Sequence, residues 1–113
     1  MLNHAMRAIE IKTKALKLTK RPIPTPAAHQ VLIQVAAAGV NRPDIMQRQG
    51  LYPAPQGTTD IPGLEISGTI IAMGTDVNHL QLGEDICALV TGGGYAEYCL
   101  ASHNVCQFLR AYL

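Results

Sequence analysis

The sequence predicts a mainly β fold, in which short strands form a closed or nearly closed barrel and one brief helix interrupts them. Several segments alternate between apolar and polar residues with a period of two, which is the period of a half-buried strand. Prolines and glycines separate these segments, and only one stretch carries clear signals for the start and end of a helix. A barrel suits this pattern, because it covers its own sheet edges.

The first two segments predict an N-terminal hairpin. Residues 6–12 alternate in character, and residues 15–19 place two leucines on one face. Three prolines follow within residues 22–26, and a proline nitrogen cannot donate a hydrogen bond to a neighbouring strand. The proline segment is therefore expected to be an extended connection outside the sheet.

Two long strands are expected in the middle of the chain. In residues 30–38, Val31, Ile33 and Val35 fall on one face, which makes this the clearest strand of the sequence. Residues 66–73 are apolar on both faces and rich in β-branched side chains. This second segment is expected to cross the middle of the barrel.

Residues 86–90 and 95–101 predict two further strands, separated by one threonine and three glycines at residues 91–94. Glycine tolerates the positive φ angles of a tight turn, so we expect this segment to join the two strands as a hairpin. A phosphate-binding loop is the alternative. The segment lacks the GxGxxG spacing, however, and a strand-like pattern follows it where a dinucleotide-binding unit needs a helix.

The one expected helix is short and well marked at both ends. Asn41 is suited to cap its start, Pro43 fits its first turn, and Asp44 stands three residues after the cap. Gly50 is then expected to end it.

Composition and charge exclude several classes of function. A chain of 113 residues with 48% hydrophobic content suits one domain, and a formal charge of +1 gives no field that would attract nucleic acid. We see neither a secretory signal nor a membrane-spanning segment, and therefore expect no membrane partner. The three cysteines, Cys87, Cys99 and Cys106, are irregularly spaced, which suits free thiols in the cytoplasm.

Five motifs together resemble the zinc-free quinone oxidoreductases of the medium-chain dehydrogenase/reductase family. They are AGVNRPD at residues 38–44, QGLYP at 49–53, PGLEISG at 62–68, LGED at 82–85 and GGGYAEY at 92–98. Each motif alone is weak. Their combination and order are specific, and the similarity extends over nearly all of residues 6–107.

The resemblance implies a GroES-like, partly open β-barrel with one or two short helices over residues 6–107. Residues 1–5 are then an N-terminal extension, and residues 108–113 depart from the family's usual continuation. Family members continue into a Rossmann domain, which we expect to be absent from this chain. In the whole enzyme, NADPH transfers a hydride to a quinone or related electron-poor carbonyl compound in the cleft between the domains. This chain would form one wall of that cleft and would be inactive alone.

The resemblance also implies that the site works without zinc. Zinc-dependent relatives place a cysteine ligand where this sequence has Asn41, and a histidine ligand where it has Leu64, just before Glu65. A carboxamide is a poor zinc ligand and leucine is none. We therefore expect no metal, and we expect Leu64 and Glu65 to line the substrate pocket or to support it.

Each candidate site residue also has a purely structural interpretation. By resemblance, Asn41 faces the nicotinamide and the quinone, but it also suits a plain helix cap. Tyr52 is placed to polarise a substrate carbonyl, or is a surface aromatic. Asp44 suits the positive end of the helix dipole as well as pocket support. Glu65, if buried, would need a cationic partner such as Arg42 or an arginine of the absent domain.

Two functions remain open at this point. The chain is either the catalytic-domain portion of a quinone oxidoreductase or a stand-alone binding or oligomerisation module without enzymatic activity. In both cases an exposed apolar patch makes a homo-oligomer possible.

Overall fold

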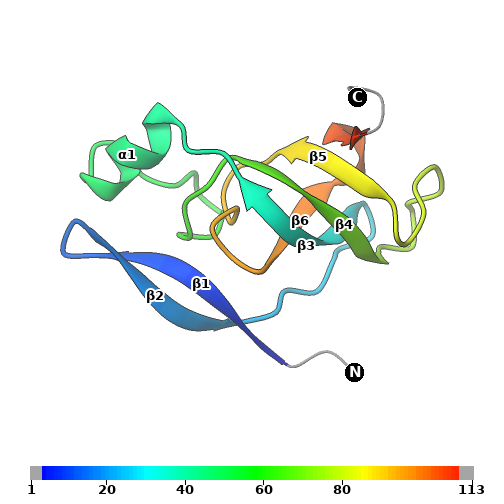
Figure 1. Ribbon diagram of the computed structural model, residues 1–113, viewed down its shortest axis with the longest axis horizontal. Helices are drawn as coiled ribbons and strands as arrows, with labels where there is room; N and C mark the ends of the chain where they lie inside the picture. Colours follow the sequence, from blue (N-terminus) through cyan, green and yellow to red (C-terminus); the bar gives the residue numbers. More distant parts are fainter. Residues whose placement is uncertain (1–3, 110–113) are drawn as a thin grey trace.

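The computed structural model describes residues 4–109, and it confirms the mainly β class. A two-stranded sheet, β1–β2, lies beside a five-stranded antiparallel sheet with the order β6-β3-β4-β5-β7 (Figure 1). The strands are β1 Ala5–Lys12, β2 Ala15–Pro22, β3 Gln30–Ala38, β4 Glu65–Met73, β5 Asp85–Leu89, β6 Tyr98–Ser102 and β7 Cys106–Phe108. The helix α1 spans Arg42–Arg48, and a 3-10 turn, η1, spans His103–Val105. No helix among residues 4–109 is long and apolar enough to cross a bilayer.

The expected N-terminal hairpin is confirmed. β1 pairs antiparallel with β2, and Thr13 and Lys14 form the two-residue turn with φ values of 54° and 60°. The inner face of β1 buries Met6 and Ala8, which pack with Ile61 in a small cluster of their own. The chain leaves the sheet within the proline segment, later than expected: Pro22 still belongs to β2, opposite Ala5, whereas Pro24 and Pro26 lie outside the strands.

β3 and β4 form the centre of the larger sheet, and the bounds of β3 match the prediction. The largest fully buried side chains include Ile33, Ile66, Ile70 and Ile86, and all four belong to one apolar cluster. β4 pairs with β3 on one side and β5 on the other, so it lies in the middle of the sheet. Burial of these branched side chains is the main stabilising contribution to the fold.

The five-stranded sheet curls strongly but stays open. Only residues 103–105 separate β6 from β7, although these strands lie at opposite edges of the sheet. The edges of a flat five-stranded sheet lie about 19 Å apart. Four residue steps reach only about 14 Å, so the sheet must bend to bring its edges near. No ladder joins β6 to β7 in the described part of the chain, and a fully closed barrel is not formed.

The expected hairpin between β5 and β6 is wrong. β5 pairs with β4 and β7, whereas β6 pairs with β3. The glycines instead cross residues 61–63: the N–H groups of Gly93 and Gly94 donate to the carbonyls of Ile61 and Gly63 at 2.8 and 3.1 Å. A Cβ on Gly63 would lie 2.7 Å from the Cα of Gly94. The close crossing of two chain segments leaves little room for a side chain at Gly92 or Gly94, and Gly93 is favoured by its φ of 91°.

The helix begins and ends as expected. The backbone N–H of Asn41 donates to Asp44 Oδ2 at 2.9 Å, which fixes the first turn. At the other end Gly50 adopts a φ of 81°, and its N–H donates to the Gln47 carbonyl at 3.0 Å. The N–H of Leu51 donates to the Met46 carbonyl at 2.8 Å, which completes a Schellman motif.

Candidate functional site

The start of α1 forms a corner built around a buried carboxylate. Asp44 is only 4% exposed. Its Oδ2 accepts hydrogen bonds from the Tyr95 hydroxyl at 2.8 Å and from the Asn41 N–H at 2.9 Å. The Tyr95 hydroxyl also lies 3.4 Å from the Gly39 carbonyl oxygen. The helix start is thus tied to the chain that follows the glycine segment, across 51 residues of sequence.

Tyr95 remains a hydrogen-bond donor over a wide pH range. Burial raises the pKa of Tyr95 to about 12, and the hydrogen bond and negative charge of Asp44 add to the shift. Oδ1 of Asp44 is buried and has no hydrogen-bond partner among the described residues. One oxygen of this carboxylate therefore orients the corner, and the other is free to accept a hydrogen bond.

Glu65 lies on the other side of the same corner. Its carbonyl accepts the Gly39 N–H at 2.9 Å, and its side chain lies so close to Gly39 that a Cβ there would overlap the carboxylate. The residue is exposed, and no ion pair with Arg42 is formed within residues 4–109. Because it is exposed, the carboxylate does not need the cationic partner that burial would have required.

The two remaining candidates differ in position. Leu64 is half-buried next to Glu65, and its carbonyl accepts the Val90 N–H at 2.8 Å. Tyr52 lies in the loop after α1 with 38% of its surface exposed. The structure therefore gathers Asn41, Asp44 and Glu65 around Gly39 and Tyr95, and Leu64 is close to this corner only through its place beside Glu65 in the chain. No hydrogen bond or ring contact in the described part of the chain links Tyr52 to them.

Sequence reasoning missed Tyr95, although it follows directly after the glycines of the GGGYAEY motif. A tyrosine that begins a strand-like segment gives no local signal of its partner, because Asp44 lies 51 residues away. The family motif was the only available indication that the position is special.

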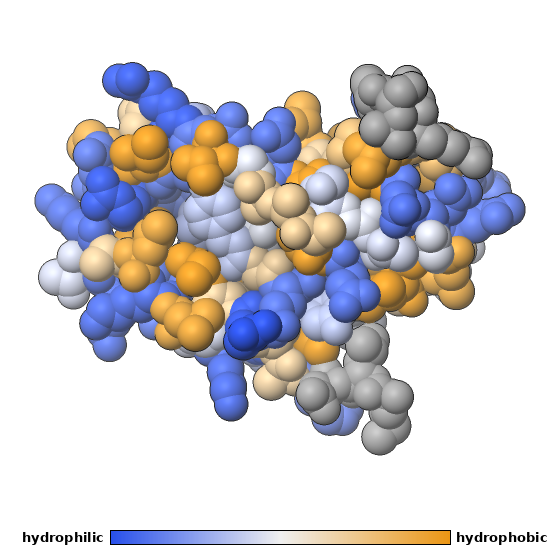
Figure 2. All heavy atoms as spheres, viewed as in Figure 1, coloured by the Kyte–Doolittle hydropathy of each residue, from blue (hydrophilic) through white to orange (hydrophobic). Residues whose placement is uncertain are grey.

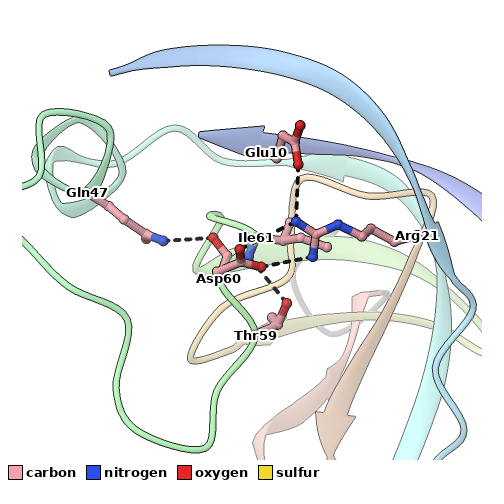
Figure 3. A network of polar contacts seen from close by, with 6 residues as sticks. All are labelled: Glu10, Arg21, Gln47, Thr59, Asp60 and Ile61. Atoms are coloured by element: carbon pink, nitrogen blue, oxygen red, sulfur yellow. Dashed lines mark hydrogen bonds and ion pairs between the residues drawn. The ribbon is translucent and has the colours of Figure 1, made fainter. Parts of the chain in front are cut away.

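A second polar network, also missed from the sequence, holds the loop between α1 and β4. Arg21 of β2 donates to Asp60 at 2.9 Å and to Glu10 at 3.4 Å, and Gln47 of α1 donates to the Asp60 carbonyl at 3.1 Å (Figure 3). The hydrogen bond from Arg21 is the main cause that lowers the pKa of Asp60. The network joins the hairpin, the helix and the loop that carries Tyr52.

A pocket of about 440 Å³ lies elsewhere on the molecule. It opens between the proline segment, the loop at residues 57–61, the glycine segment and β6, and none of the five candidate residues lines it. Cys99 forms part of its wall, and burial raises the pKa of that thiol to about 12. Cys99 is therefore not an activated nucleophile, and we place the candidate site at the corner, where the polar groups converge.

No group of three or more histidine, cysteine or carboxylate side chains lies close enough to hold a metal ion among residues 4–109. The three cysteines are free thiols. Burial also raises the pKa of Cys106 to about 11, with a contribution from Cys87. Both shifted thiols stay protonated at neutral pH, and protonated thiols are poor metal ligands and poor nucleophiles.

Comparisons with known proteins agree with this fold. The chain is 40% identical over 105 residues to the quinone oxidoreductase of Lama guanicoe, which covers 88% of this chain and 32% of that relative. The structure of human synaptic vesicle membrane protein VAT-1 homolog-like protein is 30% identical with a TM-score of 0.84, over 92% of this chain and 35% of that one. An alcohol dehydrogenase from Pyrobaculum aerophilum is 27% identical with a TM-score of 0.83, over 95% and 41%.

These matches confirm the resemblance to quinone oxidoreductases that the motifs indicated. The chain spans about a third of the length of the curated relative from Lama guanicoe. The alcohol dehydrogenase GroES-like domain matches residues 27–110, which is most of the chain. The chain therefore belongs to the alcohol dehydrogenase GroES-like domain family.

Proposed function

We propose that this chain forms the substrate-side wall of the hydride-transfer cleft in a zinc-independent, NADPH-dependent quinone oxidoreductase of the cytoplasm. The observation that carries the proposal is the corner at the start of α1, where Asn41, Asp44 and Glu65 converge around Gly39 and Tyr95. The 40% identity to a quinone oxidoreductase supports the choice of substrate class.

The residues present suit a site without zinc better than a zinc site. At the positions that correspond to zinc ligands in relatives, this chain offers the carboxamide of Asn41 and the aliphatic side chain of Leu64. Neither is a good zinc ligand. In this proposal Leu64 contributes an apolar surface beside the substrate, and the exposed carboxylate of Glu65 helps to support the corner.

Asn41 and Tyr52 carry the chemistry of this chain in the proposal. NADPH supplies the hydride when it is bound, and its site lies mostly outside this domain. The Asn41 carboxamide can donate and accept hydrogen bonds, which suits it to hold the nicotinamide and the quinone in register. The Tyr52 hydroxyl donates a hydrogen bond to the quinone oxygen on which negative charge develops. Asp44 and Tyr95 hold the start of α1, and thereby Asn41, in place.

The experiment fuses this chain to the nucleotide-binding domain of the Lama guanicoe relative and follows NADPH oxidation with 1,4-benzoquinone. We expect turnover from the fusion and none from the 113-residue chain alone. Asn41→Ser keeps a good capping residue but removes the carboxamide, and should lower kcat/KM by roughly 10- to 100-fold. Tyr52→Phe should lower it by roughly tenfold, whereas Tyr98→Phe on β6 is the matched control and should leave it unchanged.

Zinc independence has its own measurement. Metal analysis of the fusion should find no stoichiometric zinc, and 1,10-phenanthroline should not slow turnover. Zinc bound with a stoichiometry of one, together with inhibition by the chelator, would contradict this part of the proposal.

One observation favours a second candidate, a stand-alone binding or oligomerisation module. Large apolar side chains are exposed on the segments that flank the corner, namely Val40, Ile45, Leu51 and Leu89. A second domain would cover such a surface, but so would another copy of the chain. A defined homo-oligomer of the chain in light scattering, with no turnover from any fusion, would favour this module over the enzyme.

A further inference from the structure

The outer edge of β2 has no partner strand in the described part of the chain. The outer edge of β1 is used: its Ile9 N–H donates to the Tyr95 carbonyl at 2.8 Å, and its Arg7 carbonyl accepts the Glu97 N–H at 3.0 Å. Leu18 stands opposite Ile9 in the ladder. In such a non-hydrogen-bonded pair the two backbones point away from each other, so the Leu18 N–H points outward from β2.

The same alternation places two more donors on this edge. Leu16 and Lys20 lie two residues to either side of Leu18, and their N–H groups point in the same direction. Pro22 ends the strand and has no N–H to offer. The edge of β2 therefore presents an ordered row of backbone groups about five residues long.

The face of the hairpin that points away from the core carries four branched apolar side chains next to the charged pair Arg7 and Lys20. Ile9 pairs with Leu18, and Ile11 pairs with Leu16, on the face opposite the buried Met6. Leu16 and Leu18 are 49% and 69% exposed. Figure 2 shows apolar side chains gathered on the side of the molecule where the hairpin and α1 lie. An unpaired edge beside a row of branched apolar side chains is the arrangement that binds extended peptides by strand addition.

The positive charge of β2 favours an acidic partner. Lys14, Lys17 and Lys20 lie in the turn and along β2, and β2 contains no acidic residue. Two copies joined edge to edge would bring all six lysines into one ribbon, where their like charges repel. Lysines on an edge also discourage aggregation, but that role leaves the two exposed leucines unexplained.

We propose that β2 is a docking edge for an extended acidic segment of another protein, which adds to the β1–β2 sheet as a third strand. Its alternate apolar side chains lie beside Leu16 and Leu18, and its carboxylates lie on the other face of the ribbon beside Lys17. The proposal does not depend on the enzymatic function, because the hairpin lies outside residues 27–110, which the GroES-like domain family matches.

The test is an NMR titration of the 113-residue chain with the synthetic hexapeptide EVDVEI. We expect shift changes concentrated in residues 15–22 and slower hydrogen exchange at the amides of Leu16, Leu18 and Lys20. The peptide EEDVVI has the same composition without the alternation, and it should bind at least about fivefold more weakly. High salt should weaken both interactions.

Matched variants test the two parts of the proposal separately. The double variant Leu16→Ser, Leu18→Ser should weaken binding by roughly tenfold or more, whereas Leu82→Ser, at a similarly exposed leucine in the loop before β5, should not. The double variant Lys17→Glu, Lys20→Glu should no longer bind EVDVEI and should instead bind the basic peptide KVKVKI. Unchanged spectra outside the hairpin show that each variant is folded.

Three outcomes would overturn the proposal. The first is equal binding of EVDVEI and EEDVVI, and the second is a shift map centred away from β2. The third is that the leucine variants abolish dimerisation of the chain, or its binding to vesicles that contain phosphatidylserine, while the peptide never binds. In that last case the face serves a second copy or a lipid surface instead.

Discussion

The two sheets of this molecule have similar strands but are stabilised in different ways. β3 and β4 have nine residues each, and β1 and β2 have eight. In the five-stranded sheet Ile33, Ile70 and Ile86 are at most 1% exposed, whereas β2 has no buried residue. The larger sheet is held by apolar burial on its inner face, and the hairpin is held by a few buried residues of β1 and by polar contacts.

This difference teaches that strand pairing alone says little about stability. The hairpin is attached through backbone hydrogen bonds to residues 95–97 and through the ion pairs of Arg21 with Asp60 and of Arg7 with Glu97. Half-exposed ion pairs contribute little and are screened by salt, whereas buried branched side chains contribute strongly at any ionic strength. Salt and pH should therefore loosen the hairpin before they affect the core.

The largest expected effect comes from the core. Ile33→Ala should lower the free energy of unfolding by about 2–5 kcal/mol, because it leaves a cavity in a fully packed cluster. Leu18→Ala in the hairpin is the control and should change it by less than about 0.5 kcal/mol. Urea denaturation of both variants measures their losses of unfolding free energy. Equal losses would show that Leu18 contributes as much to stability as a buried core residue.

The close crossing of the glycine segment gives the next largest effect. Gly63→Ala should destabilise the fold by about 2–4 kcal/mol, since the residue has a φ of 105° and its Cβ would meet the backbone of Gly94. Gly57→Ala shares a positive φ of 82° but has open space around it, so only about 1 kcal/mol is expected. Thermal unfolding distinguishes the two, and similar values would mean that the crossing is loose.

Tyr95→Phe should cost about 1–3 kcal/mol, because it removes the hydroxyl that donates to the buried Asp44. The folded pKa of Tyr95 is raised to about 12, so the folded state keeps this proton after the unfolded state has lost it. Its contribution is complete below about pH 10 and is lost as pH rises toward 12. Denaturation at alkaline pH should show this loss in the native chain and not in Tyr95→Phe.

The smallest effect belongs to the ion pair of the hairpin. Asp60→Asn should cost at most about 1 kcal/mol, because the Asp60 side chain is largely exposed. Arg21 lowers the pKa of Asp60, so the pair stabilises above the ordinary pKa of the carboxyl and is lost as pH falls below it. Hydrogen exchange should speed up in β1 and β2 at acidic pH or in high salt. Asp76→Asn serves as the control and should leave this exchange unchanged.

The sequence predicted the elements whose signals are local. The alternation of residues 30–38 set the bounds of β3, and the capping residues of α1 located its start at Asn41 and its end before Gly50. These patterns depend on neighbouring residues, so one sequence is enough to interpret them.

Features that depend on distant partners could not be predicted in this way. Alternation located β5 and β6 but could not say which strands they pair with, and the glycines between them were therefore misassigned as a hairpin turn. The hydrogen bond between Tyr95 and Asp44 and the ion pair between Arg21 and Asp60 join residues 51 and 39 positions apart. The capping pattern already brought Asn41 and Asp44 together, but the position of Glu65 beside them was suggested only by the family motifs.

The crossing at residues 91–94 also determines where the chain can accept new sequence. Two places have the local appearance of a surface turn, the Thr13–Lys14 turn and the glycine segment. Extra residues at the first would extend a ribbon into solvent. Extra residues in the glycine segment would push apart two backbone segments that are in close contact. A reporter peptide or a circular permutation point therefore belongs at Thr13 and not among the glycines.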